Sequence, residues 1–192
     1  MKNSTQLVKS EYANQEVKSI TVSLDVNKAK ELQKILSEKV VKQGAPEELR
    51  NIVGLDVSYI GNTGIAVATL LNYPQLSLKE YVIVKGSVNI PYIPGLLAFR
   101  EAPLMIKAYE KLGCNTDLVI VDGHGITHPR KLGIASHIGI VIDRPTIGAA
   151  KKILCGDIIK TQEAEYIVVD NEIGGIVLRF NSKRIYLSIG HK

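Results

Sequence analysis

The sequence predicts an α/β fold in which a mixed β-sheet is flanked by helices. Three strand-like runs joined by short turns lie between residues 51 and 85, which indicates an antiparallel meander. After residue 95, helical and strand-like patterns alternate, which is typical of helices packed against parallel strands. The 192 residues, 45% hydrophobic and 22% charged, suffice for one domain over residues 1–192 with a continuous core.

The first expected helix begins after Asp25, whose side chain can accept hydrogen bonds from the first helical N–H groups. Apolar residues recur at helical spacing from Ala29 to Val40, and Gly44 should end this helix. Three strands are then expected, with turn residues between them. Their ranges are Asn51–Tyr59, Ile65–Leu71 and Leu78–Lys85, and the turns are Gly61-Asn62-Thr63-Gly64 and Asn72-Tyr73-Pro74.

The second half begins with Pro91-Tyr92-Ile93-Pro94-Gly95, which cannot form regular structure because of its prolines. A helix is predicted over Leu96–Leu112, with Pro103 in its first turn or at a kink, and a short buried strand over Leu118–Val121. The remaining segments are a Gly-rich loop leading to Leu132–Ile142, a short segment at Pro145–Gly148, a helix at Ala149–Leu154, and two or three strands within Tyr166–Ile189.

Composition and charge narrow the class of protein. Lys and Arg number 24 against 19 acidic residues, giving a net charge of +5, which points weakly to a polyanionic partner. No apolar run approaches the ~18 residues of a membrane helix, and MKNSTQLVKSEYANQ lacks the apolar stretch of a signal peptide. Two cysteines indicate neither a disulfide framework nor a cysteine-rich zinc site, so we expect a cytoplasmic protein. Whether Cys114 and Cys155 pair stays open.

Two carboxylates stand in unusually apolar surroundings. Asp56 lies inside a predicted strand, where a charge is costly unless it is paired or bound to metal. Asp122 follows the apolar run Leu118–Val121, at a strand end where chemistry is common. Each alone is consistent with an edge or turn aspartate. Together, on neighbouring strands ~4.8 Å apart, they could bind one Mg²⁺. Glu101, near a helix start, alone indicates a solvated acid.

The segment from Asp122 to Arg130 holds two glycines and two histidines, and two interpretations compete for it. His124 and His128 stand four apart, as zinc ligands on a helix would, but the glycines and Pro129 disfavour a helix. The alternative is a tight loop whose backbone N–H groups approach a ligand. The pair Lys151 and Lys152 is either a solvated surface or part of a phosphate-binding strip, to which Arg100, Arg130, Lys131 and Arg144 could contribute.

Five segments together resemble the endonuclease V (deoxyinosine 3′ endonuclease) family between Ile52 and Cys155. They read VGLDVS, NYPQLSL, PYIPGLLAFRE, VDGHGITHPRKLGIASHIGI and PTIGAAKKILCG. The resemblance implies an RNase H-like fold and a DNA repair endonuclease that uses Mg²⁺, or Mn²⁺ as a substitute. Such an enzyme hydrolyses the second phosphodiester 3′ to deoxyinosine, a deaminated adenine, leaving 3′-hydroxyl and 5′-phosphate ends.

The resemblance also implies roles for individual residues. Asp56, Glu101 and Asp122 match the metal-binding carboxylates, Lys151 matches the catalytic lysine, and His191 matches a catalytic histidine near the C-terminal end. Recognition of DNA and of the flipped base would fall to Pro91, Tyr92, Ile93, Pro94, Arg100, Gly123, His124, Gly125 and His128. Tyr92 would act as a wedge that fills the gap left by the extruded base. Only Lys192 follows His191, so we expect this end to fray.

The expected partner is deoxyinosine-containing DNA, with inosine in RNA as a further possibility, and no membrane. Two alternatives are an RNase H-like nuclease of other specificity, such as an excision-type incision domain, and a non-cutting protein that marks inosine. The second would require a lost carboxylate, and none of the three is missing. Oligomeric state cannot be read from the sequence, and we assume a monomer.

Overall fold

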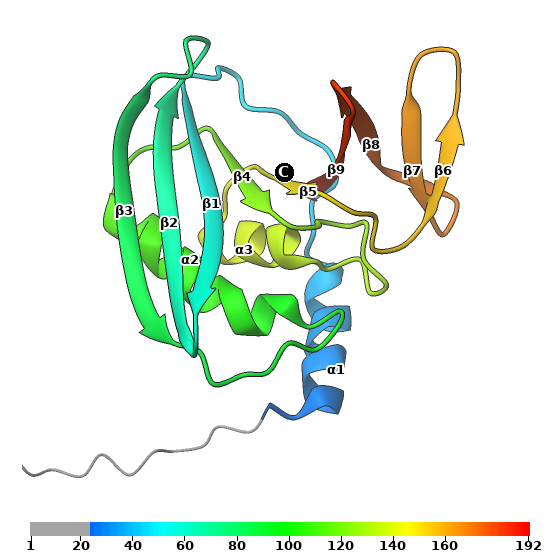
Figure 1. The fold of residues 1–192 in the computed structure, drawn as a ribbon. Helices are drawn as coiled ribbons and strands as arrows, with labels where there is room; N and C mark the ends of the chain where they lie inside the picture. Colours follow the sequence, from blue (N-terminus) through cyan, green and yellow to red (C-terminus); the bar gives the residue numbers. More distant parts are fainter. Residues whose placement is uncertain (1–23) are drawn as a thin grey trace, which may run out of the picture.

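Residues 24–192 are described by a computed structural model, in which one nine-stranded mixed sheet runs through the molecule (Figure 1). The stretch MKNSTQLVKSEYANQ, for which the sequence predicts no signal peptide, lies outside these residues. The strand order is β3-β2-β1-β4-β5-β9-β8-β7-β6. The elements are α1 (Val26–Ser37), β1 (Asn51–Ile60), β2 (Thr63–Asn72), β3 (Leu78–Ser87), α2 (Leu97–Leu112), β4 (Leu118–Asp122), α3 (Ile134–Ile142), β5 (Thr146–Ala150), β6 (Asp157–Lys160), β7 (Glu165–Val169), β8 (Glu172–Phe180) and β9 (Lys183–His191).

The mixed sheet is built as the sequence predicts. β1, β2 and β3 form the expected antiparallel meander, and β1 pairs with β2 along its whole length. β4 then lies parallel to β1 on one side and to β5 on the other. α2 and α3 make the crossovers into β4 and β5, as parallel neighbours require. The predicted fold class is therefore confirmed.

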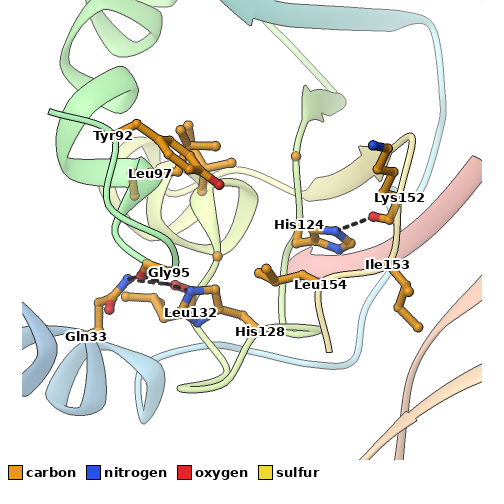
Figure 2. A pocket seen from close by; sticks show the side chains of 14 residues that line it. Gln33, Tyr92, Gly95, Leu97, His124, His128, Leu132, Lys152, Ile153 and Leu154 are labelled. Carbon is orange, nitrogen blue, oxygen red and sulfur yellow. Dashed lines mark hydrogen bonds between the residues drawn. The ribbon is translucent and has the colours of Figure 1, made fainter. Parts of the chain in front are cut away.

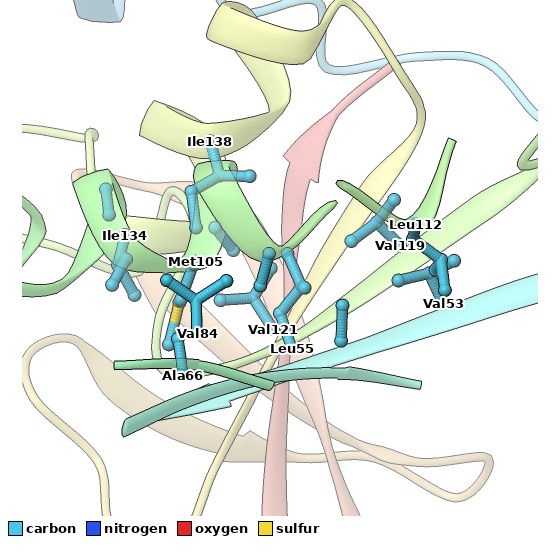
Figure 3. Close-up of a cluster of buried hydrophobic side chains, with 14 of the residues drawn as sticks. Val53, Leu55, Ala66, Val84, Met105, Leu112, Val119, Val121, Ile134 and Ile138 are labelled. Atoms are coloured by element: carbon cyan, nitrogen blue, oxygen red, sulfur yellow. The ribbon is translucent and has the colours of Figure 1, made fainter. Parts of the chain in front are cut away.

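The core lies between the sheet and the two crossover helices, α2 and α3 (Figure 3). Val53, Leu55 and Val121 point into it from β1 and β4, and Met105 and Ile138 meet them from the helices. Each such buried side chain stabilises the fold by about 1.5–3 kcal/mol. Because strand side chains alternate between faces, the residues next to Leu55 and Val121 must point away from the helices.

α1 ends at Ser37, so the prediction of a helix reaching Gly44 is wrong. Tertiary hydrogen bonds explain the early end. The carbonyl of Val41 accepts from the N–H of Lys192 at 2.8 Å, and the N–H of Val41 donates to His191 Nδ1 at 3.2 Å. These bonds hold the chain beside the end of β9 and outweigh the apolar periodicity that continues to Val40.

The predicted helix at Ala149–Leu154 is also wrong. β5 occupies Thr146–Ala150, and the chain bends after Ala150. Alanine and lysine favour helices in isolation, but here Ala149 pairs with Asp122 of β4 on one side and with Leu187 of β9 on the other. The strand pairing of β5 with both β4 and β9 therefore outweighs the local preference for a helix. β6 was not predicted, because its four side chains are all exposed and give no burial pattern.

The end of the chain is well anchored, so the expectation of fraying at His191 is wrong. His191 belongs to β9 and is 5% exposed. Its Nε2 lies 3.7 Å from a carboxylate oxygen of Asp143, and Lys192 Nζ reaches the same oxygen at 2.6 Å. Cys114 and Cys155 are both free thiols, which answers the question of pairing. Within residues 24–192, no helix is both long and apolar enough to cross a membrane.

Candidate active site

Asp56 and Asp122 come from neighbouring parallel strands. The register pairs Leu55 of β1 with Val121 of β4, so the two aspartates follow at the same level of the sheet. Both side chains turn away from the core, since Leu55 and Val121 point into it. They line one open hollow of about 380 Å³, together with Lys151 and Ile185. The sequence prediction that adjacent strands bring these carboxylates together is therefore confirmed.

Glu101 lies in the first turns of α2. Its Oε1 accepts a hydrogen bond from the Tyr59 hydroxyl at 3.0 Å. Burial raises the pKa of Glu101, and the charges of Asp56 and Asp122 raise it further, against the lowering effects of Tyr59 and Arg100. Glu101 is therefore partly buried and within electrostatic reach of the two aspartates, unlike a solvated acid at a helix start.

Lys151 supplies the positive charge of the hollow. Its Nζ donates a hydrogen bond to Asp122 Oδ2 at 2.7 Å, and this bond with the charge of Asp122 raises the pKa of the ammonium. Lys151 lies at the bend that follows β5, where it contacts the carboxylate of Asp122.

The donor set fits a hard divalent cation. All three acidic side chains offer oxygen ligands, which Mg²⁺ and Mn²⁺ prefer, and Lys151 already shows that a cation is stable against Asp122. Within residues 24–192, no three His, Cys, Asp or Glu side chains converge closely enough to enclose a metal ion. Asp56 and Asp122, which share one hollow, are residues that could hold such an ion, and water and substrate oxygens would complete the shell.

The zinc interpretation of His124 and His128 is wrong, because both imidazoles are engaged with the protein. They lie in a loop, where His124 Nδ1 contacts Thr127 Oγ1 at 2.9 Å and Nε2 contacts the Lys152 carbonyl at 2.9 Å. His128 Nε2 contacts the Gly95 carbonyl at 3.1 Å, and its Nδ1 accepts from the N–H of Arg130 at 3.2 Å. Burial lowers the pKa of both histidines, that of His128 to about 4, which favours their neutral forms.

A second pocket, of about 320 Å³, opens beside the hollow (Figure 2). Figure 2 shows Tyr92 and Leu97 on one side and His124, Lys152 and Leu154 on the other. Gly123, His124 and His128, to which the resemblance assigns base recognition, are among the residues that line it. Leu97 and Leu154 were missed by sequence reasoning, because isolated leucines carry no chemical signal. Since Gly123 follows Asp122 directly, the pocket and the carboxylates share one stretch of chain.

The loop that lines this pocket is packed without room for side chains at two glycines. A Cβ at Gly125 would overlap the carbonyl of Ile189, and one at Gly133 would overlap the carbonyl of His124. The N–H of Gly125 donates to Ser188 Oγ at 2.7 Å, and that of Gly123 donates to the Ala149 carbonyl at 3.1 Å. These two amides are thus used within the protein and do not face a ligand, contrary to the simplest form of the glycine-loop hypothesis.

The remaining predicted site residues lie either near the start of α2 or at the end of β9. Pro91, Ile93 and Pro94 belong to the irregular segment that carries Tyr92 between β3 and α2. Arg100 donates to the Ile90 carbonyl, and its guanidinium lies 4.3 Å from the centre of the Tyr59 ring, so it braces that segment. His191 lies elsewhere: it pairs with Thr146 at the start of β5, whereas Asp122 pairs with Ala149 near the end. Its catalytic role stays a prediction that the register does not favour.

The predicted phosphate-binding strip does not form as one surface. Arg130 is turned inward, where its Nη2 donates to the Gly95 carbonyl at 2.7 Å. Lys131 lies 3.4 Å from carboxylate oxygens of both Asp170 and Glu172. Of the basic residues considered, Lys151 and Lys152 are the two that border the hollow and the pocket.

Comparison with known proteins settles the family. A family model described as endonuclease V matches residues 33–192. The chain belongs to the endonuclease V family. The endonuclease V of Dictyoglomus thermophilum is 47% identical over 167 residues, which cover 84% of this chain and 73% of the relative. The chain is therefore a nuclease, an enzyme that hydrolyses phosphodiester bonds, and enzymes of this family generally need a divalent metal ion.

Solved structures of endonuclease V share the fold. The enzyme from Streptomyces avermitilis superposes with a TM-score of 0.79 at 31% identity, covering 88% of this chain and 78% of that one. The enzyme from Ciona intestinalis, in complex with a DNA containing an inosine followed by a ribo-adenosine, superposes with a TM-score of 0.74 at 22% identity, covering 86% and 82%. The mixed sheet and its crossover helices are thus those of endonuclease V.

Proposed function

We propose that this endonuclease V recognises deoxyinosine in DNA and hydrolyses the second phosphodiester bond on its 3′ side, leaving 3′-hydroxyl and 5′-phosphate ends. One observation carries the proposal: Asp56 and Asp122 lie side by side, with Lys151 bonded to Asp122, next to a separate pocket that starts at Gly123. The inosine-containing DNA in the complex of the Ciona intestinalis relative supports the choice of substrate.

The hollow supports hydrolysis assisted by Mg²⁺, for which Mn²⁺ could substitute. When bound, such an ion would neutralise charge on the phosphate and lower the pKa of a water. Asp56 and Asp122 would hold the ion, and Glu101 would orient its water shell while the Tyr59 hydroxyl fixes the Glu101 carboxylate. Lys151 would direct its ammonium to the phosphate or to the leaving oxygen, where negative charge develops.

The second pocket supports recognition of an extruded base. Its volume of about 320 Å³ and its leucine walls suit a purine ring, and Tyr92 lies at its edge with 64% of its surface exposed. A nucleotide must leave the base stack before it can enter such a pocket. Tyr92 would then fill the gap in the duplex. The chain would work as a single domain in the cytoplasm, where its substrate DNA would lie.

A labelled duplex with one deoxyinosine tests the proposal directly. With Mg²⁺, one product should appear, cut at the second phosphodiester 3′ to the lesion, and EDTA should abolish it. An adenine duplex of the same sequence is the control, and an inosine-containing RNA of that sequence shows whether RNA is also cut. Equal cutting of the adenine control, or cutting that survives EDTA, would contradict the proposal.

Tyr92→Ala should weaken binding to the inosine duplex by about 5- to 150-fold, because aromatic stacking contributes ~1–3 kcal/mol per base. Tyr92→Phe should lose much less, since the ring and not the hydroxyl fills the gap. Binding is measured with a fluorescent duplex in Ca²⁺, which can occupy oxygen sites in a different geometry from Mg²⁺. Binding by Tyr92→Ala as tight as that of the parent would make Tyr92 a turn residue only.

A further inference from the structure

The carbonyl oxygen of Gly95 is the meeting point of three hydrogen-bond donors. Gln33 Nε2 donates to it at 3.0 Å, His128 Nε2 at 3.1 Å and Arg130 Nη2 at 2.7 Å. Figure 2 shows Gln33 and His128 converging on Gly95 at the floor of the second pocket. A carbonyl oxygen has two lone pairs, so three donors saturate it and fix its position. We call Gln33, Gly95, His128 and Arg130 the Gly95 cluster.

Gln33 is the member that connects separate parts of the chain. It comes from α1, outside the five sequence segments that carry the family resemblance, and it is only 1% exposed. Besides Gly95, its Nε2 contacts the Leu132 carbonyl at 3.3 Å, and its Oε1 accepts from Arg130 Nε at 2.6 Å. One carboxamide thus joins α1, the segment before α2 and the loop after β4.

The protonation state of His128 agrees with this arrangement. Its Nδ1 accepts from the N–H of Arg130, so in the neutral ring the proton resides on Nε2, which faces the Gly95 carbonyl. Gly95 itself has a φ of +77°, and a Cβ there would lie 2.8 Å from Arg130 Nη2. His128 therefore acts on the chain and not on a bound base, and Gly95 has no room for a side chain.

The fixed Gly95 carbonyl governs where Tyr92 stands. Between the two residues lie only Ile93 and Pro94, and the N–H of Leu96 closes a turn by donating to the Ile93 carbonyl at 2.9 Å. Proline restricts its own φ and the conformation of the residue before it, so the segment is stiff. With most of its own surface exposed, Tyr92 depends on this short segment for its orientation.

We propose that Gln33 is a positioning residue for the recognition of inosine in duplex DNA, acting through the Gly95 carbonyl to hold Tyr92 at the edge of the pocket. The inference rests on the proposed function. It assigns Gln33 to the step in which a base leaves the duplex, and not to hydrolysis. Gln33 should therefore matter for a paired inosine and hardly matter for an inosine in a single strand, where no gap needs filling.

Gln33→Leu tests this with two substrates, an inosine duplex and the single-stranded inosine oligonucleotide. Loss of the carboxamide should weaken duplex binding in Ca²⁺ by about 5- to 30-fold, the range of one or two hydrogen bonds, and single-strand binding by less than about twofold. The single-turnover cleavage rate at saturating enzyme in Mg²⁺ should stay unchanged. Glu31→Leu, on the exposed side of the same helix, is the matched control and should alter neither affinity.

A double mutant shows whether the effect runs through Tyr92. If it does, Gln33→Leu added to Tyr92→Ala should cause little further loss of duplex affinity, because each substitution alone already removes the contribution of a correctly placed Tyr92 ring. If the two losses of duplex affinity multiply in the double mutant, the proposal is overturned. It is also overturned if Gln33→Leu weakens binding of both substrates equally or of neither.

Gln33→Glu covers the case in which Gln33→Leu does not fold. It keeps an oxygen for Arg130 and removes the donors to Gly95 and Leu132, and the same duplex-specific loss is expected. Failure of the proposed function would look different, since the parent protein would then not prefer inosine in either substrate.

Discussion

Asp56→Asn and Asp122→Asn should each lower the single-turnover rate of inosine-duplex cleavage by at least about a thousandfold, with the fold intact. A bound metal ion supplies several kcal/mol of transition-state stabilisation, and every 1.36 kcal/mol is a factor of ten in rate. Asparagine keeps the shape of the side chain but removes the charge that would hold the ion. Cleavage in Mg²⁺ is compared with binding to the same duplex in Ca²⁺.

Stability should not fall in these variants, because each removes a negative charge that disfavours ionised Glu101. The charges of Asp56 and Asp122 both raise the pKa of Glu101. The melting temperature without metal should therefore be unchanged or higher. Asp157→Asn, at an exposed position of β6, is the matched control and should cleave normally. Near-normal cleavage by either folded active-site variant would remove its aspartate from the metal site.

Lys151→Met should lower the same rate by about 10²–10³-fold, the cost of removing one group that stabilises developing charge. The loss should appear in the rate and not in the fold, because the Lys151 side chain is 84% exposed and an exposed ion pair contributes little to stability. Lys151→Arg keeps the positive charge on a side chain of different length and should therefore cleave faster than Lys151→Met.

Lys107→Met serves as the control for Lys151→Met, since Lys107 is an exposed lysine of α2 distant in sequence from the loops of the site. Its rate should match that of the parent. If Lys151→Met cleaves as fast as this control at saturating enzyme, the lysine only balances the charge of Asp122. If it loses duplex affinity and keeps its rate, it is a phosphate contact in the ground state.

The carboxylate site could be predicted because each aspartate conflicts with its surroundings. Asp56 interrupts an apolar strand and Asp122 ends one, and both conflicts are visible in the sequence without knowledge of the pairing. The meander and the crossover helices were predictable for a related reason, since turn residues and apolar periods are local signals. Strand register depends on residues that are far apart in sequence. The placement of Asp56 and Asp122 at the same level of the sheet is therefore visible only in the structure.

The second pocket was less predictable because its walls are joined by long-range contacts. Gln33 is a polar residue in an amphipathic helix, where the usual expectation is a solvated side chain. Its burial depends on Gly95 and Arg130, which lie more than 60 residues away in sequence. The ordered C-terminal end and the early end of α1 have the same origin, since the N–H of Val41 donates to His191 Nδ1, 150 residues away in sequence.

The close packing around Gly125 and Gly133 bears on how this enzyme could change its base preference. A loop with no space for new side chains cannot be altered gradually, because a single methyl group at either position would collide with backbone. Variation that preserves folding is thus directed to other lining residues, such as Leu97 and Leu154, whose side chains can be replaced. Libraries that randomise those two positions should yield altered specificity far more often than libraries of the glycine loop.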